Sequence, residues 1–218
     1  RVLIIDNVVP GDIVNVSTYK KRKSYYQAKP TNFIELSSKR TEPVCQHFGV
    51  CGGCKWQNMA YEHQLYYKEK EVLENLKRIG KVEISETMPI LGSEKTYFYR
   101  NKMEFSFSNS RWLTETEISS GVDIKDKNAL GFHIPGMWDK ILNIQKCHLQ
   151  EDPSNAIRNK IREFATENNI EFFNPREQIG LLRTLMIRTS STGEYMILIQ
   201  FYQEHQEKRE LLLDFIID

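Results

Sequence analysis

The first part of the chain alternates short apolar runs with turn residues, a pattern typical of β-strands. Residues 2–5 are apolar and rich in β-branched side chains, residues 10–12 (Pro-Gly-Asp) are a turn signal, and residues 13–19 alternate in part. We expect two further short strands at residues 24–28 and 33–36. Closely spaced short strands predict a small β-barrel, here a partial one because no strand pair precedes the first residue.

A long amphipathic helix is predicted from about residue 59 to residue 79. Its apolar stripe recurs at helical spacing and consists of Tyr61, Leu65, Val72, Leu76 and Ile79. Asn58 is the expected N-cap, and Gly80 stands where a left-handed C-terminal cap belongs.

The pattern returns to β-strands after residue 83. Residues 103–108 alternate between apolar and polar, residues 129–134 and 141–144 are the next strands, and residues 109–128 are expected to be a loop or hairpin excursion. Asp152-Pro153 opens a helix with Ile157, Ile161 and Phe164 on its inner face. Residues 181–189 and 195–202 form a hairpin, and residues 206–217 are helical.

These elements predict an α+β protein. Its expected parts are a partial OB-like β-barrel at residues 1–44, a cysteine loop at 45–57, a linking helix at 58–82 and a central α+β domain with a mixed β-sheet at 83–218.

Composition excludes a membrane-spanning helix and leaves an anionic partner open. Apolar residues are 40% of the 218, and no apolar run approaches the roughly 20 residues that a bilayer requires. The first residues do not form a signal peptide, so we expect a cytoplasmic protein. Residues 1–44 hold eight Lys or Arg against four acids, a net charge of +4 that leaves −3 for the rest of a chain whose total is +1. A basic first fifth indicates an anionic partner, although basic runs are also common on solvated surfaces.

Three of the four cysteines lie within ten residues, as Cys45-x5-Cys51-x2-Cys54. In a reducing compartment this spacing favours a metal or cluster site over disulfides. Intervening glycines allow backbone N–H groups to turn toward sulfur. The remaining thiol, Cys147, is the candidate fourth ligand of an iron–sulfur cluster.

Structural zinc is the alternative for these cysteines. Cysteine-only zinc sites usually take two close pairs, and here there is one pair. His47 and His148 are then possible zinc ligands in place of a cysteine. The spacing alone leaves iron–sulfur, zinc and unliganded thiols open.

Residues 43–57 (PVCQHFGVCGGCKWQ) with Tyr61, Gln64, Leu65 and Lys68 resemble the cluster loop and following helix of bacterial 23S rRNA (uracil-5-)-methyltransferases. Residues 9–14 (VPGDIV) are similar to the middle of the TRAM domain, a small RNA-binding barrel. Residues 99–102 (YRNK) and the stretch from Gly131 to Cys147 look like the central domain of that family. The resemblance covers nearly the whole chain.

The resemblance implies that Cys45, Cys51, Cys54 and Cys147 hold a structural 4Fe-4S cluster. It also implies a reaction in which a cysteine thiolate adds to carbon 6 of a flipped-out uracil. Carbon 5 then takes the methyl group of S-adenosylmethionine and loses its proton to a base. The expected partner is RNA, 23S ribosomal RNA in particular.

The chain departs from the family in two places. The barrel lacks its opening strands, and no glycine-rich cofactor loop or catalytic cysteine motif is found. We assign no catalytic and no S-adenosylmethionine-binding residue, and expect the catalytic Rossmann-like domain to be absent after residue 218. The fragment is therefore expected to be inactive although its full-length parent is an enzyme.

Seven residues are candidates for RNA contact: Lys20, Lys21, Arg22, Lys23, Tyr25, Arg100 and Lys102. The cations suit phosphates, and Tyr25 suits stacking on a base. The alternatives are a solvated turn for the basic run, packing for the tyrosine, and surface ion pairs for Arg100 and Lys102. At the level of the whole protein, the alternatives to an enzyme are a stand-alone RNA-binding module with a structural zinc or iron–sulfur site and a redox-sensing iron–sulfur protein.

Overall fold

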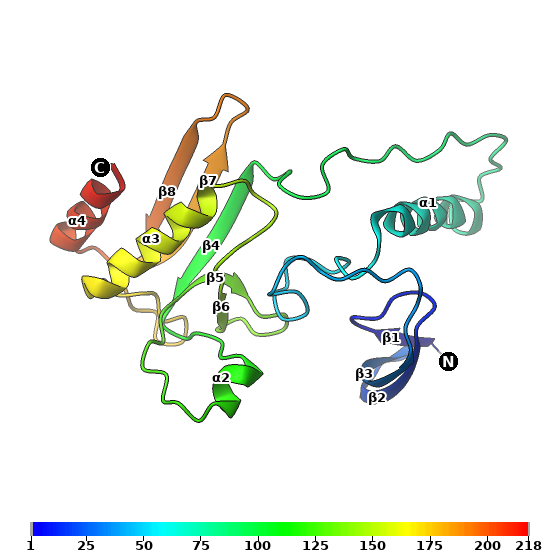
Figure 1. Ribbon diagram of the computed structural model, residues 1–218, viewed down its shortest axis with the longest axis horizontal. Coiled ribbons are helices and arrows are strands. Elements are labelled where there is room, and N and C mark those ends of the chain that lie inside the picture. Colours follow the sequence, from blue (N-terminus) through cyan, green and yellow to red (C-terminus); the bar gives the residue numbers. More distant parts are fainter. Residues whose placement is uncertain (1, 218) are drawn as a thin grey trace. The chain divides into compact units, whose positions relative to one another are not determined.

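The computed structural model describes residues 2–217, which group into two compact units (Figure 1). The first comprises the described residues up to Gly49 together with Cys54–Thr96. The second comprises Val50–Gly53 and the chain from Tyr97 onward. The cysteine loop therefore belongs in part to each unit.

The first unit contains a three-stranded sheet of order β1-β3-β2. Its strands are β1 (Val2–Ile5), β2 (Ile13–Lys21) and β3 (Tyr25–Glu35). β2 pairs with β3 antiparallel, whereas β1 pairs with β3 in parallel. The predicted partial barrel is wrong for the described residues, because β1 and β2 each have a single neighbour and the sheet stays open. The two strands expected at residues 24–28 and 33–36 are one continuous strand, β3.

A buried carboxylate fastens this sheet to the segment that leads to the cysteine loop. Asp12 Oδ1 accepts from Arg40 Nε at 2.8 Å and from the Ser37 N–H, and Oδ2 accepts from Arg40 Nη2 at 2.7 Å and from the Val9 N–H. The Asp12 side chain is 1% exposed. Bidentate pairing with a guanidinium is the strongest geometry for such a contact. Arg40 accordingly lowers the pKa of Asp12 to about 2, despite the opposing effect of burial.

Helix α1 (Tyr61–Arg78) confirms the predicted long helix but not its caps. Ala60 is the N-cap and makes no side-chain cap bond. Asn58 is instead buried just before the helix. The left-handed residue after the helix is Lys81, with φ of 55°, and not Gly80. None of the residues of α1 is fully buried, so its stripe remains half-exposed.

The second unit is a five-stranded sheet of order β6-β5-β4-β7-β8. Its elements are β4 (Lys102–Ser108), α2 (Glu115–Ser119), β5 (Ala129–His133), β6 (Ile141–Asn143), α3 (Ser154–Glu167), β7 (Leu182–Thr189), β8 (Tyr195–Phe201) and α4 (Gln206–Ile217). All four strand pairings are antiparallel, so the predicted mixed sheet is wrong. Helix α2 lies in the predicted loop, where Thr114 and Glu117 form a capping box.

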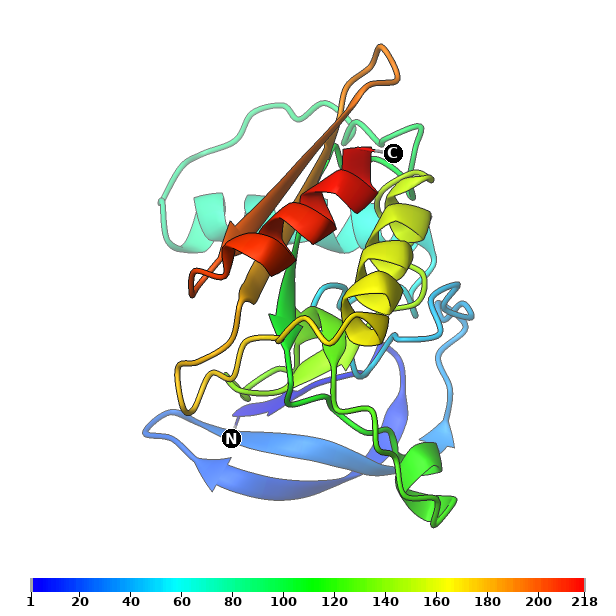
Figure 2. The ribbon, with the colours of Figure 1, turned by 90° about the vertical axis from the view of Figure 1, so that its left-hand side faces the viewer.

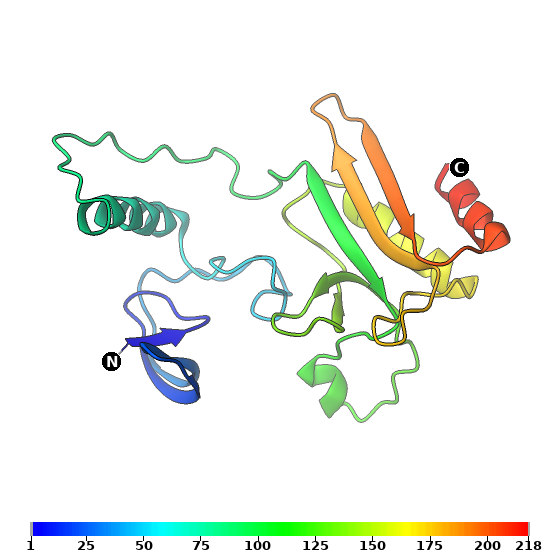
Figure 3. The ribbon, with the colours of Figure 1, turned by 180° about the vertical axis from the view of Figure 1, so that it is seen from behind.

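Two helices cover one face of this sheet (Figure 2). The rings of Phe164 on α3 and Phe215 on α4 stack at 3.9 Å, which joins the helices to each other. The core beneath them contains alternate residues of the central strands, such as Phe105, Leu185 and Ile187. Seen from behind, the sheet lies in front of both helices (Figure 3). Exposed Lys102 and Glu104 alternate with buried residues on β4, so that face is more polar.

No helix within residues 2–217 is long and apolar enough to cross a lipid bilayer.

We expect Asp12→Asn to lower the free energy of unfolding of the first unit by about 2 kcal/mol at neutral pH. The folded pKa lies below the ordinary value of 3.8, so this stability is present above pH 4 and is lost as the pH falls toward 2. Urea unfolding at several pH values measures it. Asp6→Asn, at an exposed position, is the matched control, and equal effects of the two substitutions would contradict the prediction.

Candidate metal centre and RNA-contacting residues

The cysteine loop is closed at its base by backbone pairing in the first unit. Thr41 N–H donates to Asn58 O at 3.1 Å, and Ala60 N–H donates to Lys39 O at 3.0 Å. The Cys45 N–H donates to the Gln57 side-chain oxygen at 3.2 Å. The loop that carries three cysteines therefore begins and ends at residues that are hydrogen-bonded to each other.

The loop directs backbone N–H groups at sulfur, as its glycines predict. Gly53 N–H lies 3.4 Å from Cys51 Sγ. Burial raises the pKa of the Cys45 thiol, and the N–H groups of His47 and Phe48 act in the opposite direction. Such N–H donors stabilise thiolate ligands and cluster sulfur. These N–H groups are the feature of the loop that suits thiolate ligands, whereas burial leaves the pKa of Cys45 raised and so favours its neutral thiol.

Glycine at position 52 permits the close approach of the loop to the second unit's sheet. A Cβ at this position would lie 3.1 Å from Pro135 Cγ and 3.5 Å from His133 O. Both contacts belong to the β5–β6 hairpin, and the first is tighter than most Cβ contacts. Gly52 therefore serves packing as well as turn formation.

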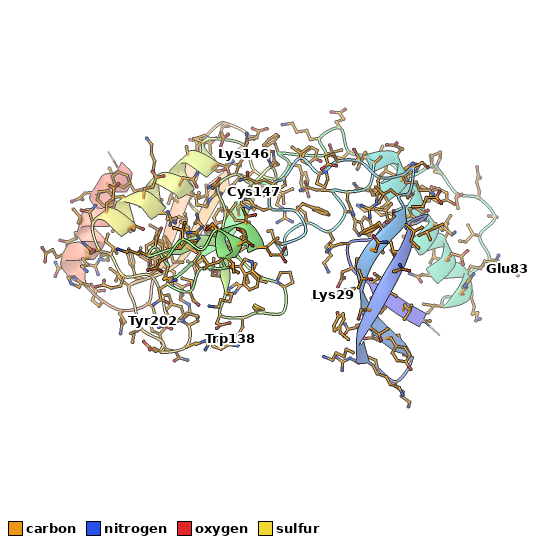
Figure 4. All side chains as sticks on the ribbon, turned by 60° about the horizontal axis from the view of Figure 1, so that its bottom comes forward. Lys29, Glu83, Trp138, Lys146, Cys147 and Tyr202 are labelled. Atoms are coloured by element: carbon orange, nitrogen blue, oxygen red, sulfur yellow. The ribbon has the colours of Figure 1, made fainter. Side chains whose placement is uncertain are left out.

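Cys147 is held by helix α3. Its N–H donates to Asn155 Oδ1 at 2.7 Å, and Asn155 Nδ2 donates back to the Cys147 carbonyl at 3.2 Å. Cys147 is buried, and Lys146 precedes it on the same loop (Figure 4). Burial also lowers the pKa of the next residue, His148, and so favours its neutral imidazole.

The guanidinium of Arg158 is buried behind this loop. It donates to Ile144 O at 3.1 Å, to Gln145 O at 2.8 Å, and to the side-chain oxygens of Asn155 and Asn159. These four acceptors are all neutral dipoles. Burial lowers the pKa of Arg158 to about 10, while the Cys147 thiol and the Asp152 carboxylate oppose that shift. The buried guanidinium therefore interacts electrostatically with Cys147, and this interaction favours the charged form of Arg158.

The four cysteines are divided between the units, with Cys45 and Cys54 in the first and Cys51 and Cys147 in the second. Within residues 2–217, no group of three or more His, Cys, Asp or Glu side chains is arranged to hold a metal ion. The predicted four-cysteine ligand set therefore stays a prediction, supported by the local surroundings of the individual thiols.

The basic run occupies the hairpin between β2 and β3. Lys20 and Lys21 end β2, and the turn that follows is closed by a bond from Arg22 N–H to Tyr25 O at 2.8 Å. From Ile13 to Ile34 the hairpin holds five Lys or Arg residues and no acid. Its four consecutive cations, Lys20 to Lys23, are exposed, and Tyr25 is half-buried.

The other two candidates lie at the start of β4, in the second unit. Arg100 is exposed just before the strand, and Lys102 pairs across the sheet with exposed Arg188. Like charges directly opposite one another repel unless an anion lies between them. The two groups of candidates belong to different units, so no single surface containing all seven is described.

Sequence reasoning missed the polar residues that face the core from α3. Asn155 and Arg158 lie three residues apart, on the same buried stripe as Ile161 and Ala165. Polar side chains at core-facing helical positions were the available signal, because buried polar groups require specific partners.

Comparison with known proteins gives relatives that match over the whole chain. No family model matches. A protein of Bacteroides thetaiotaomicron named an uncharacterized RNA methyltransferase is 52% identical over 220 residues, which cover 100% of this chain and 48% of that protein. One of Porphyromonas gingivalis with the same name is 46% identical over 97% of this chain and 47% of its own length. The chain thus spans about half the length of the curated relatives it matches.

A solved structure shares the fold. The tRNA (uracil-54, C5)-methyltransferase of Pyrococcus abyssi, in complex with S-adenosyl-L-homocysteine, matches 96% of this chain and 44% of its own with a TM-score of 0.62. Its sequence identity of 24% limits the likeness to the fold.

These comparisons correct the prediction of an inactive fragment that lacks a catalytic Rossmann-like domain. The chain matches RNA methyltransferases over its full length and shares its fold with a methyltransferase solved with a cofactor product. The prediction inferred an absence from the residue at which the sequence stops. The 218 residues span about half the length of the matched relatives, so motifs missing from them do not decide the protein's activity.

We expect Arg158→Met to lower the free energy of unfolding of the second unit by about 3 kcal/mol, because it leaves buried carbonyls without donors. Lys160→Met, at an exposed position of the same helix, is the control and should change stability by less than about 0.5 kcal/mol. Urea unfolding of both variants measures the difference. Equal midpoints would show that Arg158 contributes no net stability.

Proposed function

We propose that this protein is an S-adenosylmethionine-dependent RNA methyltransferase that methylates carbon 5 of a uridine, and that the described region binds the RNA. The observation that carries the proposal is the match to proteins named RNA methyltransferases over the full chain. The β2–β3 hairpin supports RNA as the partner, because its residues 13–34 hold five Lys or Arg and no acid, and its exposed cations suit a phosphate backbone.

We further propose that the substrate is 23S ribosomal RNA. The support is the resemblance of residues 43–57 to the cluster loop of that branch of the family. The alternative substrate is transfer RNA, because the structural neighbour is named a tRNA (uracil-54, C5)-methyltransferase.

Cys45, Cys51, Cys54 and Cys147 are proposed to hold a 4Fe-4S cluster in a structural role. The Gly53 N–H directed at Cys51 and the buried guanidinium of Arg158, which interacts electrostatically with Cys147, support negatively charged thiolate ligands. S-adenosylmethionine supplies the methyl group when bound, and none of the described residues is assigned to hold it.

The full-length protein with labelled S-adenosylmethionine should transfer methyl groups to ribosomal RNA, and nucleoside analysis should identify 5-methyluridine. Transfer RNA supplied in the same assay should remain unlabelled. Labelling of transfer RNA alone would replace the proposed substrate, and labelling of neither RNA would overturn the proposed activity.

The Lys20→Gln/Lys21→Gln variant should bind RNA more weakly, with a shallower dependence of affinity on salt.

Anaerobically purified full-length protein should contain about four irons and four sulfides per chain. Cys51→Ser and Cys147→Ser should each lose most of the iron, whereas His47→Ala and His148→Ala should retain it. A protein that contains zinc and no sulfide, and that loses the zinc in His47→Ala or His148→Ala, would replace the proposed cluster with a zinc site of cysteine and histidine ligands.

A further inference from the structure

Trp138 is a large aromatic residue left in solvent at the tip of the β5–β6 hairpin. It is 65% exposed, and the neighbouring Met137 is 41% exposed. Most tryptophans are largely buried, so an exposed one is an informative feature of a surface. The ring is not part of the cysteine loop or of the basic β2–β3 hairpin.

The loop that carries Trp138 is fixed by its neighbours. Met137 N–H donates to Ile134 O at 2.9 Å, and Ile134 N–H donates to Lys140 O at 3.1 Å. Gly136, with φ of 79°, takes the left-handed position that the turn requires. Lys140 Nζ donates to Ser110 Oγ at 2.8 Å. An exposed ring on an anchored loop loses little conformational entropy when a ligand stacks on it.

A second aromatic group with a cation lies where β7 begins and β8 ends. Arg183 Cζ lies 4.8 Å from the centre of the Phe173 ring and 5.2 Å from that of the Tyr202 ring. The two rings contact each other at 4.7 Å. Within the described residues no ion pair neutralises Arg183, and Tyr202 remains exposed.

Residues 174–179 connect the two aromatic groups. The buried Asp139 carboxylate, next to Trp138, accepts from Arg176 at 2.6 Å. Arg176 lies three residues after Phe173, on a turn closed by Asn174 N–H to Ile179 O at 2.8 Å. Trp138 and Tyr202 both appear along one border of the second unit in Figure 4. We name Trp138, Arg176, Arg183 and Tyr202 the aromatic–arginine edge.

We propose that the aromatic–arginine edge binds single-stranded RNA, with Trp138 as the platform on which a base stacks. The inference rests on the proposed RNA methyltransferase function and assigns a further substrate contact to it. Exposed aromatic rings interleaved with guanidinium groups are the combination that binds unpaired bases together with their phosphates.

The charge of the edge favours RNA over a protein partner. The guanidinium of Arg176 remains largely exposed although Asp139 pairs with it. Bases in a duplex do not offer their faces to a side chain, whereas those in loops and single strands do. The edge is therefore suited to an unpaired segment of the substrate.

The test measures affinity of the full-length protein for a fluorescently labelled single-stranded oligoribonucleotide and for the same strand in a duplex. Trp138→Leu should weaken binding of the single strand about tenfold and leave duplex binding unchanged. Trp138→Phe, which keeps a ring, should lose less. Tyr66→Leu, at an exposed tyrosine of α1, is the matched control and should bind as the unmodified protein does.

Salt dependence separates the roles of the two residues. Trp138→Leu should leave the slope of log affinity against log salt unchanged, because stacking releases no counterions. Arg183→Gln should reduce that slope by about one. An equal loss of single-strand and duplex binding in Trp138→Leu would overturn the stacking role.

The alternative to RNA as the partner of the aromatic–arginine edge is another part of the full-length protein. The emission of Trp138 is the part of the tryptophan fluorescence that Trp138→Leu removes. If acrylamide fails to quench this emission in the absence of RNA, Trp138 is covered by protein and the proposal is overturned. Failure of the proposed function is distinct, because the unmodified protein would then neither bind nor methylate RNA. If the unmodified protein binds and methylates RNA and Trp138→Leu binds single-stranded RNA equally well, the proposed function stands and the stacking role of Trp138 is wrong.

Discussion

The second unit depends on one buried guanidinium. Arg158 reaches from α3 to the carbonyls of the chain after β6, and its Cζ lies 4.9 Å from the centre of the Phe105 ring on β4. It therefore joins helix, sheet and the loop of Cys147 in a single contact. A buried cation is costly unless every donor finds an acceptor, and this requirement fixes the loop in one conformation. The position of the Cys147 thiol follows from that constraint.

The first unit depends on a related contact in which the buried charge is negative. There the buried carboxylate of Asp12 accepts from three residues, Val9, Ser37 and Arg40, and Arg40 lies next to the ends of the cysteine loop. Both units thus use a charged group at the point where irregular chain must be held in place. Loops cannot satisfy their backbone groups by regular pairing, so a side chain with several donors or acceptors replaces it.

The proposed RNA contacts divide between two physical mechanisms. The β2–β3 hairpin offers exposed positive charge, which attracts any phosphate backbone regardless of its sequence. This attraction weakens as the salt concentration rises. The aromatic–arginine edge offers flat rings on anchored loops, which selects unpaired bases by their faces. One mechanism brings RNA to the protein and the other discriminates among its conformations. Both features lie outside the cysteine loop.

The sequence by itself determined most strands and helices, because periodicity reports which face of an element is buried. It also determined the ligand candidates at Cys45, Cys51 and Cys54, because their spacing is local. Tertiary structure decided which strands pair, and it opened the expected barrel and made the central sheet antiparallel. It also decided that Asn155 holds the backbone of Cys147, that Arg176 pairs with Asp139 beside Trp138, and that Arg183 lies over the Tyr202 ring. These contacts join residues far apart in the chain, and no local pattern records the energy of a pairing that forms only when the core closes.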